Sequence, residues 1–199
     1  MPPRLLPIAL LLAFWLTSLA HLDTVPPVYE DEPWQASTGW KLATEGVFGS
    51  DLFRGYYGME RHYYGYMPLH PLLLAAVFRL AGLGLFQARL EAVILTTFTL
   101  ALTYALGRRL AGRAAAGLAV GLLLLARTGA HTPSQYTGIV LVDVARIARY
   151  DAAVPVFGLL SLHALWTAGE RRGAAWYGLA GLLAALAGLS HLYGLFWLP

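Results

Sequence analysis

Two adjacent carboxylates, Asp31 and Glu32, are the residues of this chain best suited to chemistry. They follow a hydrophobic N-terminal segment and begin a long, aromatic-rich loop. At the rim of an apolar region, a carboxylate can accept a proton as a general base or hold a cation. We take both as candidate catalytic residues. The alternative is that they only cap a helix with Pro33 at its first position and its end at Gly46.

A second polar group lies in the segment VDVARIARYDAAV, residues 142–154. If this segment is helical, Arg146 and Arg149 share one face, and an arginine there can clamp a substrate phosphate through two hydrogen bonds. Asp151 would then join Asp31 in binding a divalent cation, which the oxygen ligands predict to be Mg²⁺ or Mn²⁺. The alternative is an interface helix whose arginines meet lipid phosphates.

Aromatic residues and one histidine complete the set of candidate substrate-binding residues. Tyr63 and Tyr64 belong to the tyrosine-rich stretch GYYGMERHYYGYMPLHP, and flat rings of this kind can stack on sugar faces. The alternative is an aromatic belt at a membrane interface. His191 lies in an apolar segment near its outer end, where an ionisable residue is a functional candidate by default.

The composition is typical of an integral membrane protein. Of 199 residues, 58% are hydrophobic and only 13% are charged, whereas soluble domains carry about 25% charged residues. Mean hydropathy is +0.57. The absence of cysteine excludes disulfide and thiol chemistry. The net charge of +3 comes from arginines scattered beside apolar runs, not from a basic stripe with stacking aromatics, so we do not expect a nucleic-acid partner.

The elements that would position these residues are membrane-spanning helices. A span needs roughly 17–25 residues, and five segments qualify: 5–22, 90–106, 114–130, 152–168 and 174–198. We expect an all-α, multi-span bundle with a long outer loop over about 23–88, in which 69–86 forms an interfacial helix. The positive-inside rule then puts the N-terminus and the arginine-rich turns inside, and both acidic groups outside.

Several motifs, taken in order, resemble those of one family of membrane enzymes. They are Asp31-Glu32 after the first span, PLHPLLLA, FQARL, GRRLAGRAAAGLA and ARYDAAV. In this order they resemble the N-terminal part of GT-C fold glycosyltransferases, especially the dolichyl-phosphate-mannose protein mannosyltransferase and aminoarabinose transferase group. The resemblance covers nearly the whole chain, but only the first portion of such an enzyme.

The resemblance implies transfer of a sugar from a polyprenyl-phosphate donor to an acceptor at the outer face of the plasma (inner) membrane. The acceptor could be a protein, a glycan or a lipid. Two other functions stay open: a transporter or flippase-like carrier, and a non-catalytic scaffold or enzyme fragment. The first segment, with Arg4 and the sequence Ser18-Leu19-Ala20, also resembles a cleavable secretory signal.

Overall fold

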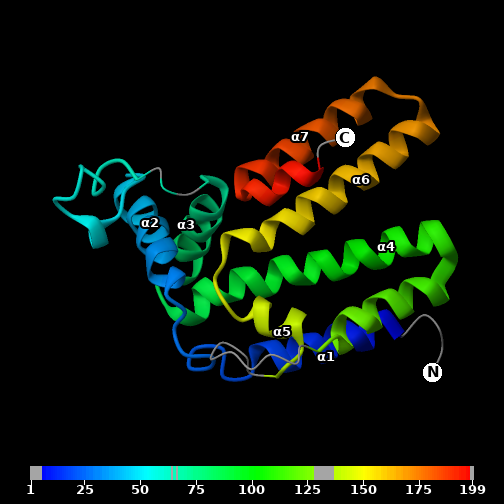
Figure 1. Ribbon diagram of the computed structural model, residues 1–199, viewed down its shortest axis with the longest axis horizontal. Helices are drawn as coiled ribbons and strands as arrows, with labels where there is room; N and C mark the ends of the chain where they lie inside the picture. Colours follow the sequence, from blue (N-terminus) through cyan, green and yellow to red (C-terminus); the bar gives the residue numbers. More distant parts are fainter. Residues whose placement is uncertain (1–5, 64, 66, 128–136, 198–199) are drawn as a thin grey trace.

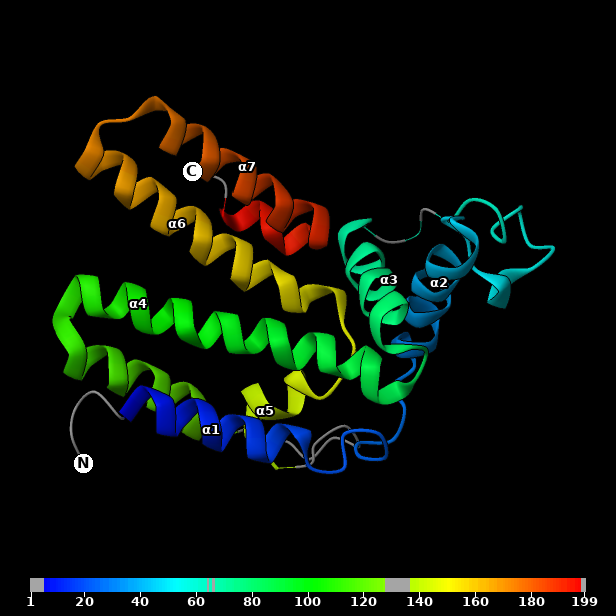
Figure 2. The ribbon, with the colours of Figure 1, turned by 180° about the vertical axis from the view of Figure 1, so that it is seen from behind.

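The computed structural model describes residues 6–63, 65, 67–127 and 137–197, and within these ranges the chain is helical with no β-strand. The predicted all-α fold is therefore confirmed. Four apolar helices form its main body: α1 (Leu6–Leu19), α4 (Leu85–Leu125), α6 (Ala153–Arg171) and α7 (Ala174–Ser190). Figures 1 and 2 show α4 between α1 and α6, with α7 packed on α6.

The remaining elements are shorter and gather mostly at one end of this body. Helices α2 (Asp31–Glu45) and α3 (Leu69–Ala81) pack together there, as both ribbon views show. Helix α5 (Val140–Ala145) lies against α4 and α1. Three 3₁₀ turns, η1 (Asp51–Phe53), η2 (Tyr150–Ala152) and η3 (Leu192–Trp197), complete the described elements. The α6–α7 turn and the sharp bend in α4 both lie at the opposite end (Figure 1).

Helix α4 is bent at Gly112, which adopts a left-handed φ of 82° that a side chain would disfavour. The bend divides it into two antiparallel arms, and the two predicted spans 90–106 and 114–130 fall on different arms. The second arm ends at Leu125, so it is shorter than predicted. Phe14 and Leu22 pack with Val93, Leu100 and other apolar residues of both arms in one core cluster.

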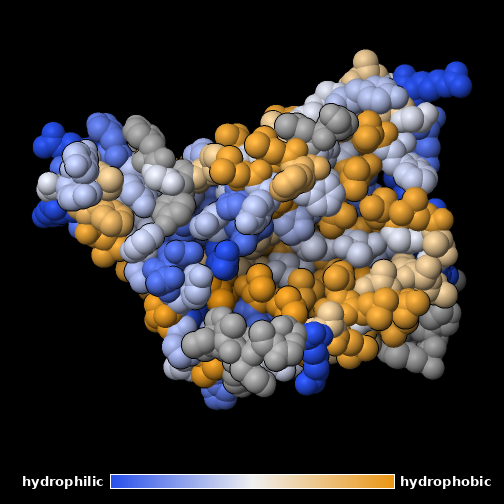
Figure 3. Space-filling model, viewed as in Figure 1, coloured by the Kyte–Doolittle hydropathy of each residue, from blue (hydrophilic) through white to orange (hydrophobic). Residues whose placement is uncertain are grey.

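Among the described residues, two segments are long and apolar enough to cross a membrane by length and composition, Leu85–Leu125 and Tyr150–Arg171. The apolar helices α1, α3 and α7 are shorter. Hydrophobic residues cover much of the surface over the long helices, and hydrophilic residues collect over α2 and its following loop and at the α6–α7 turn (Figure 3). Several leucines point outward from these helices, for example Leu16 at 75% exposure and Leu118 at 64%.

Other predicted helices also end earlier than expected. The predicted helix 69–86 stops at Ala81, because Gly82 turns the chain with a φ of 81° before α4 begins. The predicted span 174–198 stops at Ser190, where His191 becomes extended and the chain folds back on α7. Gly194 lies directly against the backbone of Ala187, so close that no Cβ would fit there.

Close packing of α2 on α3 sets the position of the first acidic group. Gly39 lets α2 approach Leu74 so closely that a Cβ would lie 2.8 Å from the leucine Cβ. Arg79 donates to the carbonyls of Leu42 and Ala43 at the far ends of the same two helices. These contacts fix α2 against α3.

Candidate functional site

A buried ion pair joins the start of α2 to α4. Arg89 donates from Nε and Nη2 to the two oxygens of Glu32, each at 2.8 Å, and the two residues are 0% and 1% exposed. A third guanidinium nitrogen donates to the carbonyl of Leu22 at 2.9 Å. This two-pronged geometry fixes α2 relative to the end of the first helix.

Glu32 also accepts hydrogen bonds from two backbone N–H groups, one three residues before it and one 116 residues after it. Its Oε2 accepts from Tyr29 at 2.8 Å, and its Oε1 accepts from Ala148 at 3.0 Å. The sequence predicts a catalytic role for Glu32, but both oxygens already hold protein groups. We therefore treat it as the positioning residue that brings the segment after α5 next to Asp31.

The next residues of that segment form a second charged pair. Arg149 binds Asp151 through Nε at 3.2 Å and Nη2 at 3.1 Å, and both side chains are about a quarter exposed (28% and 25%). Its guanidinium also lies 5.6 Å from the centre of the Tyr29 ring. Burial lowers the pKa of Arg149, but the charge and hydrogen bond of Asp151 outweigh burial and raise it overall. Arg149 is therefore a permanent cation at the surface of the site.

Aromatic residues complete the site on the side of α7. Tyr150 stacks on His191 with ring centres 4.8 Å apart, and His191 contacts Tyr193 at 4.2 Å. Asp31, partly exposed in the first turn of α2, lies within electrostatic range of Tyr150. Four of the predicted site residues thus come together from three separate segments: Asp31, Arg149, Asp151 and His191.

The pH response of His191 is a testable property of this site. Burial lowers its pKa below the usual value, and Asp151 offsets only part of that shift. Because the folded chain binds this proton less readily than the unfolded chain, stability should decline as pH falls below about 6.5 and through the lower folded pKa. We expect His191→Gln to flatten this acid limb in melting temperatures measured from pH 7.5 to 5. The exposed His62, changed to Gln, is the control. An acid limb that persists in His191→Gln would contradict the assignment.

Arg146, predicted to bind substrate, is fully buried and engaged with the main chain. It donates to five backbone carbonyls between Thr17 and Val25, at distances from 2.7 to 3.3 Å. The shared helical face predicted for Arg146 and Arg149 is absent, because α5 ends at Ala145 and Arg149 is extended. The neighbouring Asp143 accepts hydrogen bonds from the N–H and the hydroxyl of Thr137, at 2.7 and 2.8 Å. The contacts of Arg146 suit a residue that fixes the end of α1.

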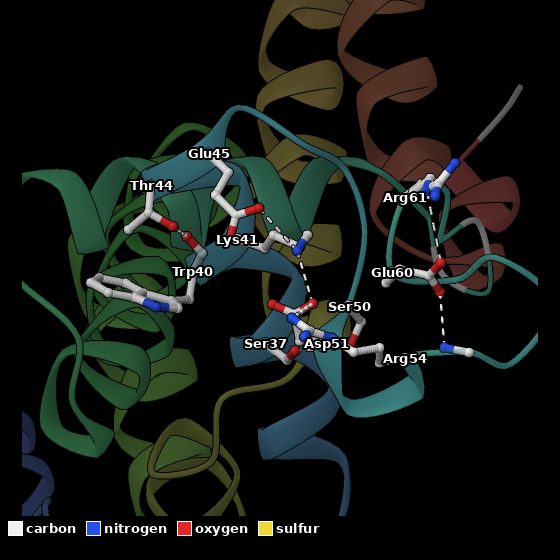
Figure 4. A network of polar contacts seen from close by, with 11 residues as sticks. Ser37, Trp40, Lys41, Thr44, Glu45, Ser50, Asp51, Arg54, Glu60 and Arg61 are labelled. Carbon is white, nitrogen blue, oxygen red and sulfur yellow. Dashed lines mark hydrogen bonds and ion pairs between the residues drawn. The ribbon is translucent and has the colours of Figure 1, made fainter.

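The tyrosine-rich loop is attached to α2 by a polar network (Figure 4). Buried Lys41 donates to Asp51 at 2.8 Å and pairs with Glu45 at 3.0 Å. This hydrogen bond, with a smaller effect from Arg54, lowers the pKa of Asp51. Ser37 and Ser50 share a further hydrogen bond of 2.8 Å.

Tyr63 lies inside this loop and not on its surface. Its ring stacks on Phe53 with centres 5.3 Å apart, and the residue is 7% exposed. Tyr64 lies outside the described residues. Tyr56 and Tyr57 of this loop are exposed, at 59% and 85%. The predicted sugar contact by Tyr63 would require this loop to rearrange.

The predicted cation site has little support in the geometry. Among the described residues, no group of three or more His, Cys, Asp or Glu side chains is arranged to hold a metal ion. Both oxygens of Asp151 are also bound by Arg149. A site built from Asp31 and Asp151 would have to displace that arginine. Mg²⁺ or Mn²⁺ binding stays a prediction, and we derive no step through it.

Sequence reasoning missed two buried ionisable residues of α4. In the sequence, Arg89 stands out only as part of the motif FQARL, and Glu91 directly follows that motif. Glu91 is 4% exposed and lies 3.3 Å from Nδ1 of the fully buried His70. The signal was present, since two charges in the first turns of an apolar helix are costly unless each has a partner.

Searches against family models, curated proteins and solved structures found no match to this chain.

Proposed function

We propose that this chain is part of a membrane glycosyltransferase that moves a sugar from a polyprenyl-phosphate donor to an acceptor. One observation carries the proposal: Asp31, the Arg149–Asp151 pair and the aromatic group around His191 converge at one end of an apolar helical body. The motif order described above, which resembles GT-C fold enzymes, supports the same class. A base, a fixed cation and flat rings beside a membrane suit a lipid-linked sugar donor.

In this proposal Asp31 is the general base. It accepts the proton of the acceptor hydroxyl as that oxygen attacks the anomeric carbon of the sugar. The bond between this carbon and the phosphate oxygen breaks, and the polyprenyl phosphate leaves with the bonding electrons. The products are the glycosylated acceptor and the free lipid phosphate, and the proton resides on Asp31 until it passes to water.

Arg149 is the group best placed to stabilise the departing phosphate. Asp151 occupies only part of its five-donor fork, so further N–H groups can reach phosphate oxygens. Arg146 is excluded from this role in our scheme because its donors hold main-chain carbonyls. The exposed ring of Tyr193, 61% exposed beside His191, offers a face on which a sugar can stack.

The arrangement of charge supports an integral membrane location with the site on the outer face. The arginine-rich turns GRRLAGR and GERRG lie at the end of the body opposite α2 and α3 (Figure 1). By the positive-inside rule that end faces the cytoplasm, so the proposed active site faces outward. The donor's lipid tail would then lie along the apolar helices.

The test is a transfer assay in membranes that contain the protein. Donors would be a panel of polyprenyl-phosphate sugars, with the matching nucleotide sugars as the alternative donor class. We expect labelled sugar to move only from the lipid donors. Transfer from nucleotide sugars alone, or no transfer from any donor by well-inserted protein, would reject the proposal and favour a carrier or scaffold.

A further inference from the structure

A cleft lies at the end of the helical body opposite the candidate active site, and both polar and apolar side chains line it. It has a volume of about 230 Å³ and lies between α4, α6 and α7. Arg109, His163, Thr167 and Trp176 line one part of it, and leucines such as Leu179 and Leu183 line the rest. None of these residues belongs to the candidate active site.

Arg109 is the cation of this cleft, and its present partners hold it loosely. Its Nη1 donates to the Thr167 hydroxyl at 3.4 Å, and its Nη2 is 3.9 Å from Glu170. Both distances are near the outer limit for such contacts. The side chain is 38% exposed, so most of its donors remain accessible to a ligand from outside.

Two further features make the cleft attractive to an anion. Trp176 stands in the first turn of α7, and the start of a helix carries partial positive charge. Arg171 lies 5.6 Å above the same indole ring, which places another cation at the wall. The turns GRRLAGR and GERRG that flank the cleft carry five arginines against one glutamate.

We infer that this cleft binds the phosphate of an anionic phospholipid, with its acyl chains along the leucine wall. Basic pockets between membrane helices on the cytoplasmic side bind anionic head groups for the same physical reason. The apolar wall distinguishes this ligand from a free phosphate ester, which would leave the leucines exposed to water. The inference rests on the proposed membrane location, but not on sugar transfer.

The experiment is native mass spectrometry of the purified protein in detergent, titrated with phosphatidylglycerol or phosphatidylcholine of the same chain length. We expect tighter binding of phosphatidylglycerol. Arg109→Gln should weaken it about tenfold, equivalent to about 1.4 kcal/mol. Arg113→Gln, a change at an exposed arginine of the same end outside the cleft, should change binding less than about twofold. Equal losses in the two variants would show diffuse attraction and overturn the inference.

Two more pairs of measurements keep the test independent of folding defects. Glu170→Gln removes a carboxylate that competes for Arg109, so it should strengthen binding. Leu179→Trp should fill the cleft and weaken binding without altering charge, whereas Leu182→Trp on the same helix lies outside the cleft and should not. Weaker binding in Glu170→Gln, or no difference between the tryptophan variants, would contradict the site.

The source of the phosphate is tested with glycerophosphoglycerol, the same head group without acyl chains. We expect no displacement of phosphatidylglycerol at equal concentration, and displacement would indicate a site for soluble phosphate esters instead. Because no measurement here reads sugar transfer, a negative result in the donor panel would leave this outcome unchanged.

Discussion

Asp31→Asn is expected to lower sugar transfer by about 10²–10⁴-fold, the usual contribution of a general base. The amide keeps the size of the side chain but cannot take the proton of the acceptor hydroxyl. Asp31 is partly exposed, and its neighbour Glu32 carries the buried contacts of this turn, so the variant should fold and insert normally. The rate is measured with saturating lipid donor, so that a change in donor affinity does not enter.

Asp23→Asn is the matched control, because Asp23 is an exposed carboxylate of the same loop, away from the first turn of α2. It should retain the wild-type rate. A further comparison is the dependence of the rate on pH, since the loss of a base should remove the acid limb. Near-normal turnover by Asp31→Asn would remove Asp31 from the base role and leave the donor assay to decide the reaction class.

Arg89→Met is expected to cause the largest loss of stability of any single change discussed here, about 3–5 kcal/mol. It removes one partner of a fully buried pair and leaves the Glu32 carboxylate without its positively charged partner. The measurement is the free energy of unfolding in detergent, or the melting temperature if unfolding is irreversible. Transfer should be lost together with the fold of the site.

Two variants decide whether the loss comes from the unpaired charge. The double change Arg89→Met with Glu32→Met removes both charges and should recover a large part of the stability. Arg54→Met breaks an exposed pair with Asp51 and should cost no more than about 1 kcal/mol. If the double variant were no more stable than Arg89→Met, the lost hydrogen bonds of Arg89 to main-chain carbonyls, and not the unpaired charge, would explain the effect.

The helical class and most helix positions followed from local properties of the sequence. Apolar runs predicted α1, α6 and the two arms of α4, and Gly46 correctly marked the end of α2 with a left-handed φ of 71°. The sequence predicts Pro33 as the first helical residue, but α2 begins two residues earlier, at Asp31. A proline anywhere in the first turn leaves no hydrogen bond unmade, so its position there is loosely determined.

The site was harder to predict because its contacts are long-range. Residue types drew attention to Asp31, Arg149, Asp151 and His191, and the structure brings these four residues together, while their roles stay predictions. Composition alone does not tell Arg149 from Arg146, although one faces the site and the other holds main-chain carbonyls. That difference depends on where α5 ends and on what packs against it. Likewise, Glu32 differs from Asp31 mainly through partners 57 and 116 residues away.

The contacts of Arg146 also mean that the end of the first helix cannot complete its hydrogen bonds until most of the chain has been synthesised. The carbonyls that it binds belong to residues 17–25, up to 129 positions earlier in the chain. At about 5–20 residues per second, synthesis leaves the exit of the first helix without this partner for several seconds or more. During that time these carbonyls can accept only from solvent or from local donors, such as the N–H groups of Thr24 and Val25 that bind the carbonyl of His21. The end of the first helix therefore gains its final contacts only when Arg146, from the second half of the chain, has been synthesised.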